Sequence, residues 1–177
     1  MTRFEQVQAV GGEPSLLDWQ HIHNRIIPTD PLSVAAVQAR AERNHLEVAY
    51  LDEVAVGCST VRPPTGDTAT ATVIARVLPN YRRRGLGEQI YQRGLAIARQ
   101  LGAQAVETVV LASNGDGLRF ARHHGFVELE RYVLPGHTVA FVDLRLVPRG
   151  QRRAAAVQGR SGRDHAVQSM SSVEDTR

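Results

Sequence analysis

The stretch NYRRRGLGEQI, residues 80–90, places three arginines and two glycines directly before an amphipathic helical pattern. The start of a helix presents free backbone N–H groups and the positive end of the helix dipole, so it attracts anions. Gly85 and Gly87 lack a Cβ atom, which lets an anion approach this backbone closely. The arginines add charge and forked hydrogen-bond donors. Together these residues predict a site for a phosphate-bearing ligand.

Two widespread phosphate motifs do not fit this turn. A P-loop requires a lysine followed by serine or threonine, and the chain contains no lysine. The dinucleotide-binding pattern GxGxxG would begin at Gly85, but it meets Ile90 where its third glycine belongs. No regular series of βαβ units surrounds the turn either. The site therefore needs another explanation.

The remaining pattern, Arg82-x-x-Gly85-x-Gly87 after a strand that ends VLP, resembles the coenzyme A pyrophosphate loop of the GNAT superfamily of N-acetyltransferases. That family's signature is Gln/Arg-x-x-Gly-x-Gly/Ala. The resemblance implies an acyl-coenzyme A donor, most simply acetyl-CoA, and an amine acceptor that is a small molecule or a peptide. It also implies direct transfer of the acyl group.

A later segment matches the same family. There the family has an asparagine, a small residue three positions on, an aromatic residue six positions on, and Gly-Phe eleven and twelve positions on. At these spacings the chain has Asn114, Gly117, Phe120, Gly125 and Phe126. With the preceding helices and hairpin, the resemblance covers roughly residues 3–146.

The resemblance implies the family's α/β (α+β) fold. This is a mixed, mostly antiparallel sheet of about six to seven strands with about four flanking helices. The sheet is splayed between its fourth and fifth strands, and the acyl-coenzyme A lies in the splay. It implies an oxyanion donor, a backbone N–H near Val77 or Leu78. The residues expected to contact the cofactor are Val77, Leu78, Arg82, Arg83, Arg84, Gly85, Leu86, Gly87, Glu88, Asn114 and Phe120.

The catalytic acid departs from the family pattern. The family commonly has a tyrosine seven residues after the asparagine, as general acid for the leaving thiolate, and this chain has Ala121 there. A thiol of pKa near 8.5 is a fair leaving group without full protonation. Ser113, Tyr132, His123 or a water molecule could replace the tyrosine, and the sequence does not choose among them.

A catalytic base is needed because an alkylammonium of pKa near 10.4 must lose a proton before it attacks a thioester. Glu107 is the candidate, since it is a charge inside the otherwise apolar strand AVETVVL. The alternative is a strand-end glutamate that faces solvent or an arginine.

Hydrophobic periodicity predicts the elements that position these residues. Ser15 is expected to cap a helix that ends near Ile27, with Trp19, Ile22, His23 and Ile26 on one stripe. Ser33 is expected to cap a second helix, with Val34, Val37 and Ala41 facing inward. The further expected elements are a weak strand within 2–10, a hairpin over 46–61, a loop over 62–67, a strand over 68–78, a helix over 86–101, a strand over 105–111, a helix over 116–124, and strands over 126–134 and 138–146.

Charge divides the chain into two parts. Six of the 21 basic residues and three of the 18 acidic residues follow Pro148, so residues 1–147 carry 15 charges of each sign. The neutral body disfavours a nucleic-acid-binding protein. We expect a GNAT-like domain over residues 1–147 and a basic, disordered tail over 148–177. No apolar run is long enough for a membrane span or signal peptide, so a cytoplasmic protein without membrane contact is expected.

One cysteine, Cys58, leaves no internal disulfide and no cysteine-based zinc cluster, and no metal site is expected from the histidines. The sequence therefore predicts an acetyl-CoA-dependent N-acetyltransferase. A second hypothesis is an acyl-CoA-binding or regulatory domain of the same fold with lost or weak catalysis, which Ala121 allows. The identity of the acceptor and the oligomeric state are left open.

Overall fold

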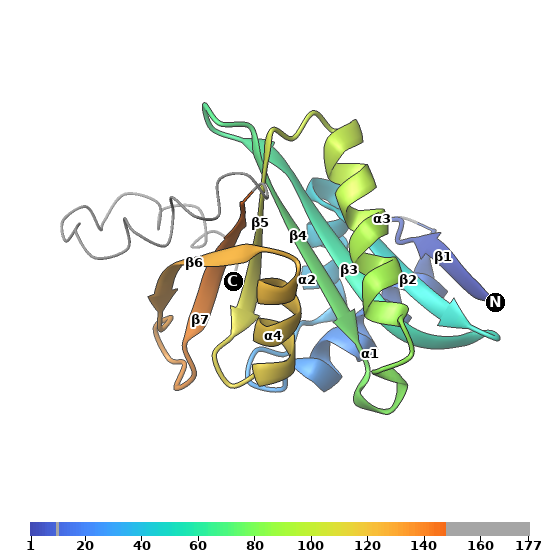
Figure 1. The fold of residues 1–177 in the computed structure, drawn as a ribbon. Coiled ribbons are helices and arrows are strands. Elements are labelled where there is room, and N and C mark those ends of the chain that lie inside the picture. The colour runs from blue at the N-terminus through green and yellow to red at the C-terminus, as the bar shows by residue number, and fades with distance from the viewer. Residues whose placement is uncertain (10, 148–177) are drawn as a thin grey trace, which may run out of the picture. The chain divides into compact units, whose positions relative to one another are not determined.

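The structure, a computed structural model, describes residues 1–9 and 11–147, so the expected tail lies outside the described residues. Within them, seven strands form one sheet in the order β1-β2-β3-β4-β5-β7-β6 (Figure 1). The elements are β1 Thr2–Gln6, α1 Glu13–Ile26, α2 Val34–Arg43, β2 His45–Leu51, β3 Val54–Thr65, β4 Thr70–Val77, the 3-10 turn Pro79–Tyr81, α3 Leu86–Gln100, β5 Ala105–Leu111, α4 Gly115–His123, β6 Phe126–Tyr132 and β7 Phe141–Leu146. The mixed α/β fold expected from the sequence is confirmed.

Helices cover both faces of the sheet. Figure 1 shows α3 and α4 on the near face and α1 and α2 on the far face. The α3–α4 cluster includes Val73, Leu95 and Val142, and the α1–α2 cluster includes Trp19 and Cys58. Each face therefore has its own apolar core. Of the helices described, none combines the length and apolar character that a membrane span needs.

The pair β4 and β5 is the parallel pair of the described sheet, and it is short. Its register joins Thr70 to Ala105, Ala71 to Val106 and Thr72 to Glu107. Beyond these residues the two strands continue without pairing to each other, and Figure 1 shows them moving apart toward their carboxyl ends. The sheet is thus open at this edge, as the splay between the fourth and fifth strands requires.

Two helix-capping expectations had different outcomes. Ser33 caps α2, because its Oγ accepts a hydrogen bond from the Ala36 N–H at 3.1 Å. Ser15 does not cap α1, which begins two residues earlier with Pro14 in its first turn. Proline suits that position because its missing N–H would have no helical partner there. Ser15 Oγ instead donates to the Gly12 carbonyl at 3.2 Å.

The hairpin over residues 46–61 is confirmed as β2 and β3, turning at Asp52 and Glu53. The loop expected over 62–67 is wrong in part, because β3 continues to Thr65. Its register with β4 is irregular between Arg62 and Thr65, where two prolines cannot donate ladder hydrogen bonds.

Two apolar residues at helix ends lie at the surface, and one of them, Val34, was expected to face inward. Val34 is 39% exposed at the first position of α2, and Leu101 is 47% exposed just after α3 ends. Both stand at helix ends, where the next turn that would cover them is absent. The stripe of Trp19, Ile22 and His23 on α1 is buried as expected.

Candidate active site

The turn before α3 holds unpaired backbone donors. Gly85 has a φ of 76° and Arg83 a φ of 63°, so both adopt the left-handed conformation. After Arg82, the next N–H that donates to a backbone carbonyl is that of Gln89, which bonds the Gly85 carbonyl at 3.2 Å. Within the described part of the chain, the N–H groups of residues 83–88 have no backbone or side-chain acceptor. This is the arrangement that binds phosphate oxygens.

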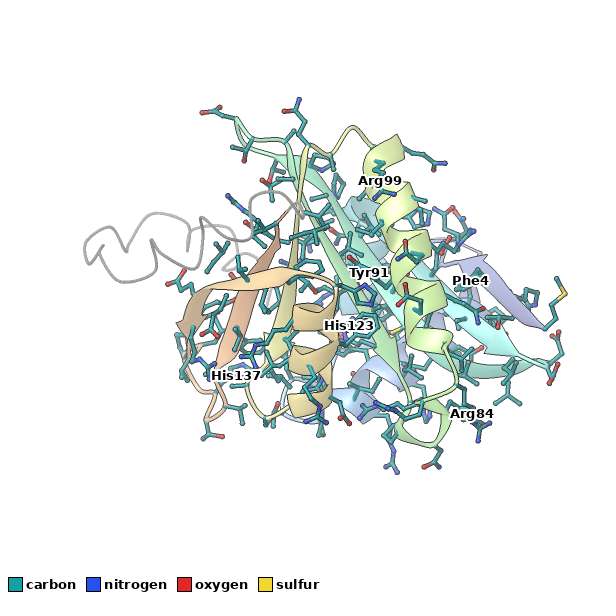
Figure 2. The ribbon with its side chains drawn as sticks, in the orientation of Figure 1. Phe4, Arg84, Tyr91, Arg99, His123 and His137 are labelled. Carbon is teal, nitrogen blue, oxygen red and sulfur yellow. The ribbon has the colours of Figure 1, made fainter. Side chains whose placement is uncertain are left out.

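The first turn of α3 lies against the end of β4 and against α4. A Cβ atom added to Gly87 would lie 3.8 Å from Val77 Cγ2 and 4.0 Å from Phe120 Cε2. Gly87, Val77 and Phe120, which the sequence predicted to contact the cofactor, therefore lie close together. Figure 2 shows Arg84 in the loop at this end of α3 and Arg99 at the far end of the same helix.

The backbone of Val77 faces the opening in the sheet. The Leu78 N–H donates to the Val56 carbonyl at 2.9 Å, which makes these two residues a hydrogen-bonded pair of the antiparallel ladder. Such pairs alternate along a ladder, so the adjacent pair, Val77 with Gly57, points its N–H groups away from the partner strand. The Val77 N–H thus points toward β5, where no strand pairs with it. Of the two expected oxyanion donors, Val77 has the free N–H.

Arg82 holds the end of β4 in place. Its Nε atom donates to the Val77 carbonyl at 3.0 Å, on the same side of the strand as the Val77 N–H. The guanidinium therefore orients the residue that faces the opening, in addition to any charge it offers to an anion.

Glu107 lies at the closed end of the splay. It is level with Thr72, five residues before Val77 on β4, which corresponds to roughly 16 Å along the strand. Arg145 Nε and Nη2 donate to Glu107 Oε1 at 2.9 and 2.6 Å. The carboxylate faces an arginine, as the alternative interpretation stated. From this position it can serve as a base only through a chain of water molecules.

Tyr132, a predicted candidate acid, is hydrogen-bonded to Asp143, which was not predicted as a site residue. Tyr132 Oη donates to Asp143 Oδ1 at 3.2 Å. Burial, together with the Asp143 charge, raises the pKa of Tyr132 to about 12, so the hydroxyl stays protonated at neutral pH. Burial also raises the pKa of Asp143, and Glu107 and Glu130 add to this. Asp143 was missed, although a carboxylate in the apolar strand FVDLRL resembles the signal that drew attention to Glu107.

Comparison with known proteins identifies the fold and the family. Residues 14–126 match the model of the acetyltransferase (GNAT) family. This chain belongs to the GNAT acetyltransferase family. Acetyl-CoA is the acetyl donor of these enzymes, and the residues around the α3 turn fit it, because they combine unpaired N–H groups with a left-handed glycine. No curated protein matches the sequence.

Many solved structures share the GNAT fold with this chain, among them the following three. One is provisionally named a phosphinothricin N-acetyltransferase, with 19% identity, 82% of this chain and 98% of that chain covered, and a TM-score of 0.67. An N-acetyltransferase from Staphylococcus aureus Mu50 has 16% identity, with 82% and 98% covered and a TM-score of 0.66. The protein yncA from Salmonella typhimurium, solved with its cofactor acetyl-CoA, has 15% identity, with 82% and 92% covered and a TM-score of 0.62.

Ser113 is the candidate acid that lies at the open edge of this GNAT sheet. Ser113 follows Glu107 by six residues, as Leu78 follows Thr72, so both residues lie at the carboxyl ends of the two diverging strands, at the open edge of the sheet. The side chain is exposed in the turn before α4. Neighbouring Asn114 caps α4, since its Oδ1 accepts from the Gly117 N–H at 3.0 Å. A Cβ on Gly117 would come within 2.5 Å of Asn114 Nδ2, so the small residue in this GNAT motif is required by packing.

Ala121 lies inside the α3–α4 core, where it is 4% exposed. His123 is exposed, and Figure 2 shows it on α4. Glu88, expected to contact the cofactor, has its Oε2 2.8 Å from His124 Nε2. This contact ties the first turn of α3 to the end of α4 and holds Phe120, whose ring centroid is 4.3 Å from that of His124.

Proposed function

We propose that this protein transfers the acetyl group of acetyl-CoA directly to an amine, with the donor bound between the α3 turn and the β4–β5 opening. One observation carries the proposal. In the described part of the chain, the N–H groups of residues 83–88 and of Val77 have no acceptor, and they lie at the same edge of the sheet. The first set suits a pyrophosphate, and the second suits an oxyanion that develops on the acetyl carbonyl.

In this reaction the acceptor nitrogen forms a bond to the acetyl carbon as the carbon–sulfur bond breaks. The nitrogen loses a proton, and the sulfur departs as a thiol after it gains one. Val77 N–H would stabilise negative charge on the carbonyl oxygen. Ser113 would place a hydroxyl or a bound water near the sulfur, and Asp143 and Glu107 would accept the amine proton through water. Tyr132 orients Asp143 through its hydrogen bond.

A covalent acyl-enzyme on Cys58 is disfavoured by the position of that thiol. Cys58 is fully buried in the α1–α2 core, and burial raises its pKa to about 11. A buried thiol that is not ionised at neutral pH is a poor nucleophile. The two-substrate direct route uses the open edge of the sheet and needs no cysteine.

The second candidate function is acyl-CoA binding without efficient transfer. Burial of Ala121 favours it, because a tyrosine in that position would overpack the α3–α4 core rather than reach the opening. Under this candidate the α3 turn still binds the cofactor, but no side chain of α4 supplies a proton.

The test is amine-dependent release of free thiol from acetyl-CoA, with mass spectrometry of the acetylated product. The panel contains simple alkylamines, polyamines, amino acids and a peptide with a free N-terminus. We expect turnover that Gly85→Val lowers by about 10- to 100-fold at sub-saturating acetyl-CoA and that Arg99→Gln, at the far end of α3, preserves. Tight binding of acetyl-CoA with no turnover on the whole panel would replace the transfer proposal with the binding candidate.

A further inference from the structure

Two buried polar atoms have no hydrogen-bond partner in the described part of the chain, and both belong to residues beside Trp19. They are His23 Nδ1 and Arg76 Nη1. The His23 ring stacks on Trp19 with centroids 5.2 Å apart, and Arg76 Cζ lies 5.9 Å from the centroid of the Trp19 ring. Buried polar atoms are nearly always paired, so two such atoms at one indole require an explanation.

The two atoms offer opposite hydrogen-bonding capacities. His23 Nε2 lies 3.1 Å from the Asp30 carbonyl oxygen, so Nε2 carries the proton and donates. Nδ1 is then a lone pair that can only accept. Burial is the largest cause that lowers the pKa of His23 to about 4, and the charge of Arg76 adds to it, so the ring is neutral. Arg76 Nη1 can only donate.

Arg76 lies next to the proposed acetyl position. It is the residue before Val77 on β4, and its register partner on β3 is Cys58. Cys58 packs in the α1–α2 cluster, so the Arg76 side chain lies on that face, opposite α3 and α4. An acceptor that approaches the Val77 N–H from the α1–α2 face would pass this guanidinium.

Arg76 lies within electrostatic reach of two further arginines, Arg40 and Arg62. Burial, and then the charge of Arg76, lowers the pKa of Arg40 on α2, and Arg62 on β3 lowers the pKa of both. No described carboxylate forms a salt bridge with any of the three. Asp30 is near enough to raise the pKa of Arg40, and Arg62 is near enough to lower the pKa of Asp143, yet no salt bridge of the described residues joins either pair.

Packing alone does not account for this guanidinium. Its contact with Trp19 provides a cation–π interaction, and it also has a hydrogen bond with the Cys58 side chain, but Nη1 has no partner among the described residues. An arginine whose donor is buried and unpaired costs free energy in the unliganded protein. A bound anion would recover it, and guanidinium geometry matches a carboxylate.

We propose that Arg76, with the charge of Arg40 nearby, binds a carboxylate of the acceptor while His23 Nδ1 accepts an N–H of the same molecule. The acceptors are therefore amino acids or related amines that carry a carboxylate close to the nitrogen. This substrate class rests on the proposed acetyl transfer. The carboxylate could instead belong to the acyl group of the donor, as in succinyl-CoA, and the experiment separates these two sources.

The experiment compares each of a set of amino acids with its own amide, in which the carboxylate is neutral. Thiol release is measured with acetyl-CoA for the unmodified protein, Arg76→Gln, Arg76→Lys and the control Arg99→Gln. We expect the unmodified protein and the control to prefer the acid over the amide by about 10- to 100-fold in kcat/KM, as a charged hydrogen bond provides. Arg76→Gln should remove that preference mainly by slowing the acid, and Arg76→Lys should restore part of it.

A second arm repeats the assay with succinyl-CoA and the amides. Faster transfer from succinyl-CoA than from acetyl-CoA that Arg76→Gln removes would assign the carboxylate to the donor and overturn the acceptor class. An acid-to-amide ratio that is equal in the unmodified protein and in Arg76→Gln would also overturn it. Circular dichroism of each variant establishes that the comparison is made on folded protein.

A third arm does not depend on turnover. Saturation-transfer NMR measures binding of a mixture of N-acetylated amino acids to the protein with coenzyme A present. If no amine is acetylated but these carboxylates bind and Arg76→Gln abolishes the signal, the acetyl-transfer proposal fails and the carboxylate site stands. If acetylation occurs without any dependence on Arg76, the transfer proposal stands and the carboxylate site fails. Absence of both turnover and carboxylate binding overturns both.

Discussion

Two charged side chains reach into the interior from neighbouring parts of the sheet, and they differ in what surrounds them. Glu47 on β2 has a side chain only 3% exposed, and Arg93 of α3 holds it with hydrogen bonds of 2.5 Å to Oε2 and 2.8 Å to Oε1. His45 Nε2 lies 3.0 Å from the same carboxylate. Arg76 on β4 has a buried Nη1 with no partner and no salt bridge among the described residues.

The comparison distinguishes Glu47, whose charge is paired in the free protein, from Arg76, whose charge we propose is paired by a ligand. Burial alone would raise the pKa of Glu47, but the hydrogen bonds from His45 and Arg93 outweigh burial and lower it. Its charge is therefore compensated when the chain folds. Arg76 lies one residue from the proposed acetyl position and has no salt bridge among the described residues. The Cys58 side chain is its hydrogen-bonding neighbour, and that thiol is neutral at neutral pH. An ionisable group whose pKa is shifted by burial beside an opening is a candidate for a functional site.

The largest effect on stability is expected when Glu47 loses the arginine that pairs with it. Arg93→Met should leave Glu47 buried with His45 as its remaining partner and lower the free energy of unfolding by about 3 kcal/mol. This corresponds to a fall in Tm of about 10 °C. Thermal unfolding at neutral pH measures it, with Arg99→Met as the matched control on the same helix. Glu47→Gln combined with Arg93→Met should recover part of the loss, and a single variant within about 1 °C of the parent would contradict the structural role.

The next effect concerns His23 and pH. The pKa of His23 is about 4 in the folded protein and near 6.5 in the unfolded chain. Between these two pH values, His23 is therefore protonated in the unfolded chain but neutral in the folded protein. Stability attributable to this residue should fall by roughly 3 kcal/mol as pH drops from 6.5 to 4. His23→Gln should lose less stability over that window than the parent. His21→Gln, on the exposed side of α1, should decline as the parent does; equal declines in all three proteins would contradict burial of a neutral ring.

A smaller effect is expected on the affinity for acetyl-CoA when the α3 turn is changed, since the unpaired groups there are backbone donors. Gly85→Val places a β-branched residue at a φ of 76° and should weaken acetyl-CoA binding by about 10- to 100-fold. Gly87→Ala is the matched variant and should weaken binding less, because its Cβ atom would lie no closer than 3.8 Å to neighbouring protein atoms. Calorimetric titration compares them. If Gly87→Ala weakened binding more than Gly85→Val, the backbone geometry of the turn would not be what binds the donor.

Local sequence signals predicted the parts of this fold that depend on neighbours along the chain. The turn at Asp52 and Glu53, the Ser33 cap and the Asn114 cap each involve residues within a few positions of one another. The Arg82-x-x-Gly85 pattern likewise places its whole motif in one turn. Such features follow from short-range geometry and are visible in a single sequence.

Partners distant in sequence could not be predicted. Glu107 is separated by 38 residues from Arg145, and no local pattern indicates that β5 and β7 bring them together. Alternation along β4 places Arg76 on one face but does not say whether that face supplies a counter-ion. That depends on the packing of α1 and α2, which sets the position of Trp19.

The central claim, that Arg76 serves a ligand rather than the fold, is tested most directly by measuring Tm and kcat/KM of Arg76→Met on one preparation, with Arg99→Met beside it. We expect Tm to rise by about 2 to 4 °C, because a half-buried charge without a salt-bridge partner among the described residues is removed. We expect kcat/KM for carboxylate-bearing amines to fall by about 10- to 100-fold. A clear fall in Tm with unchanged kcat/KM would contradict the claim and place Arg76 with Glu47, among the charges that hold the free protein together.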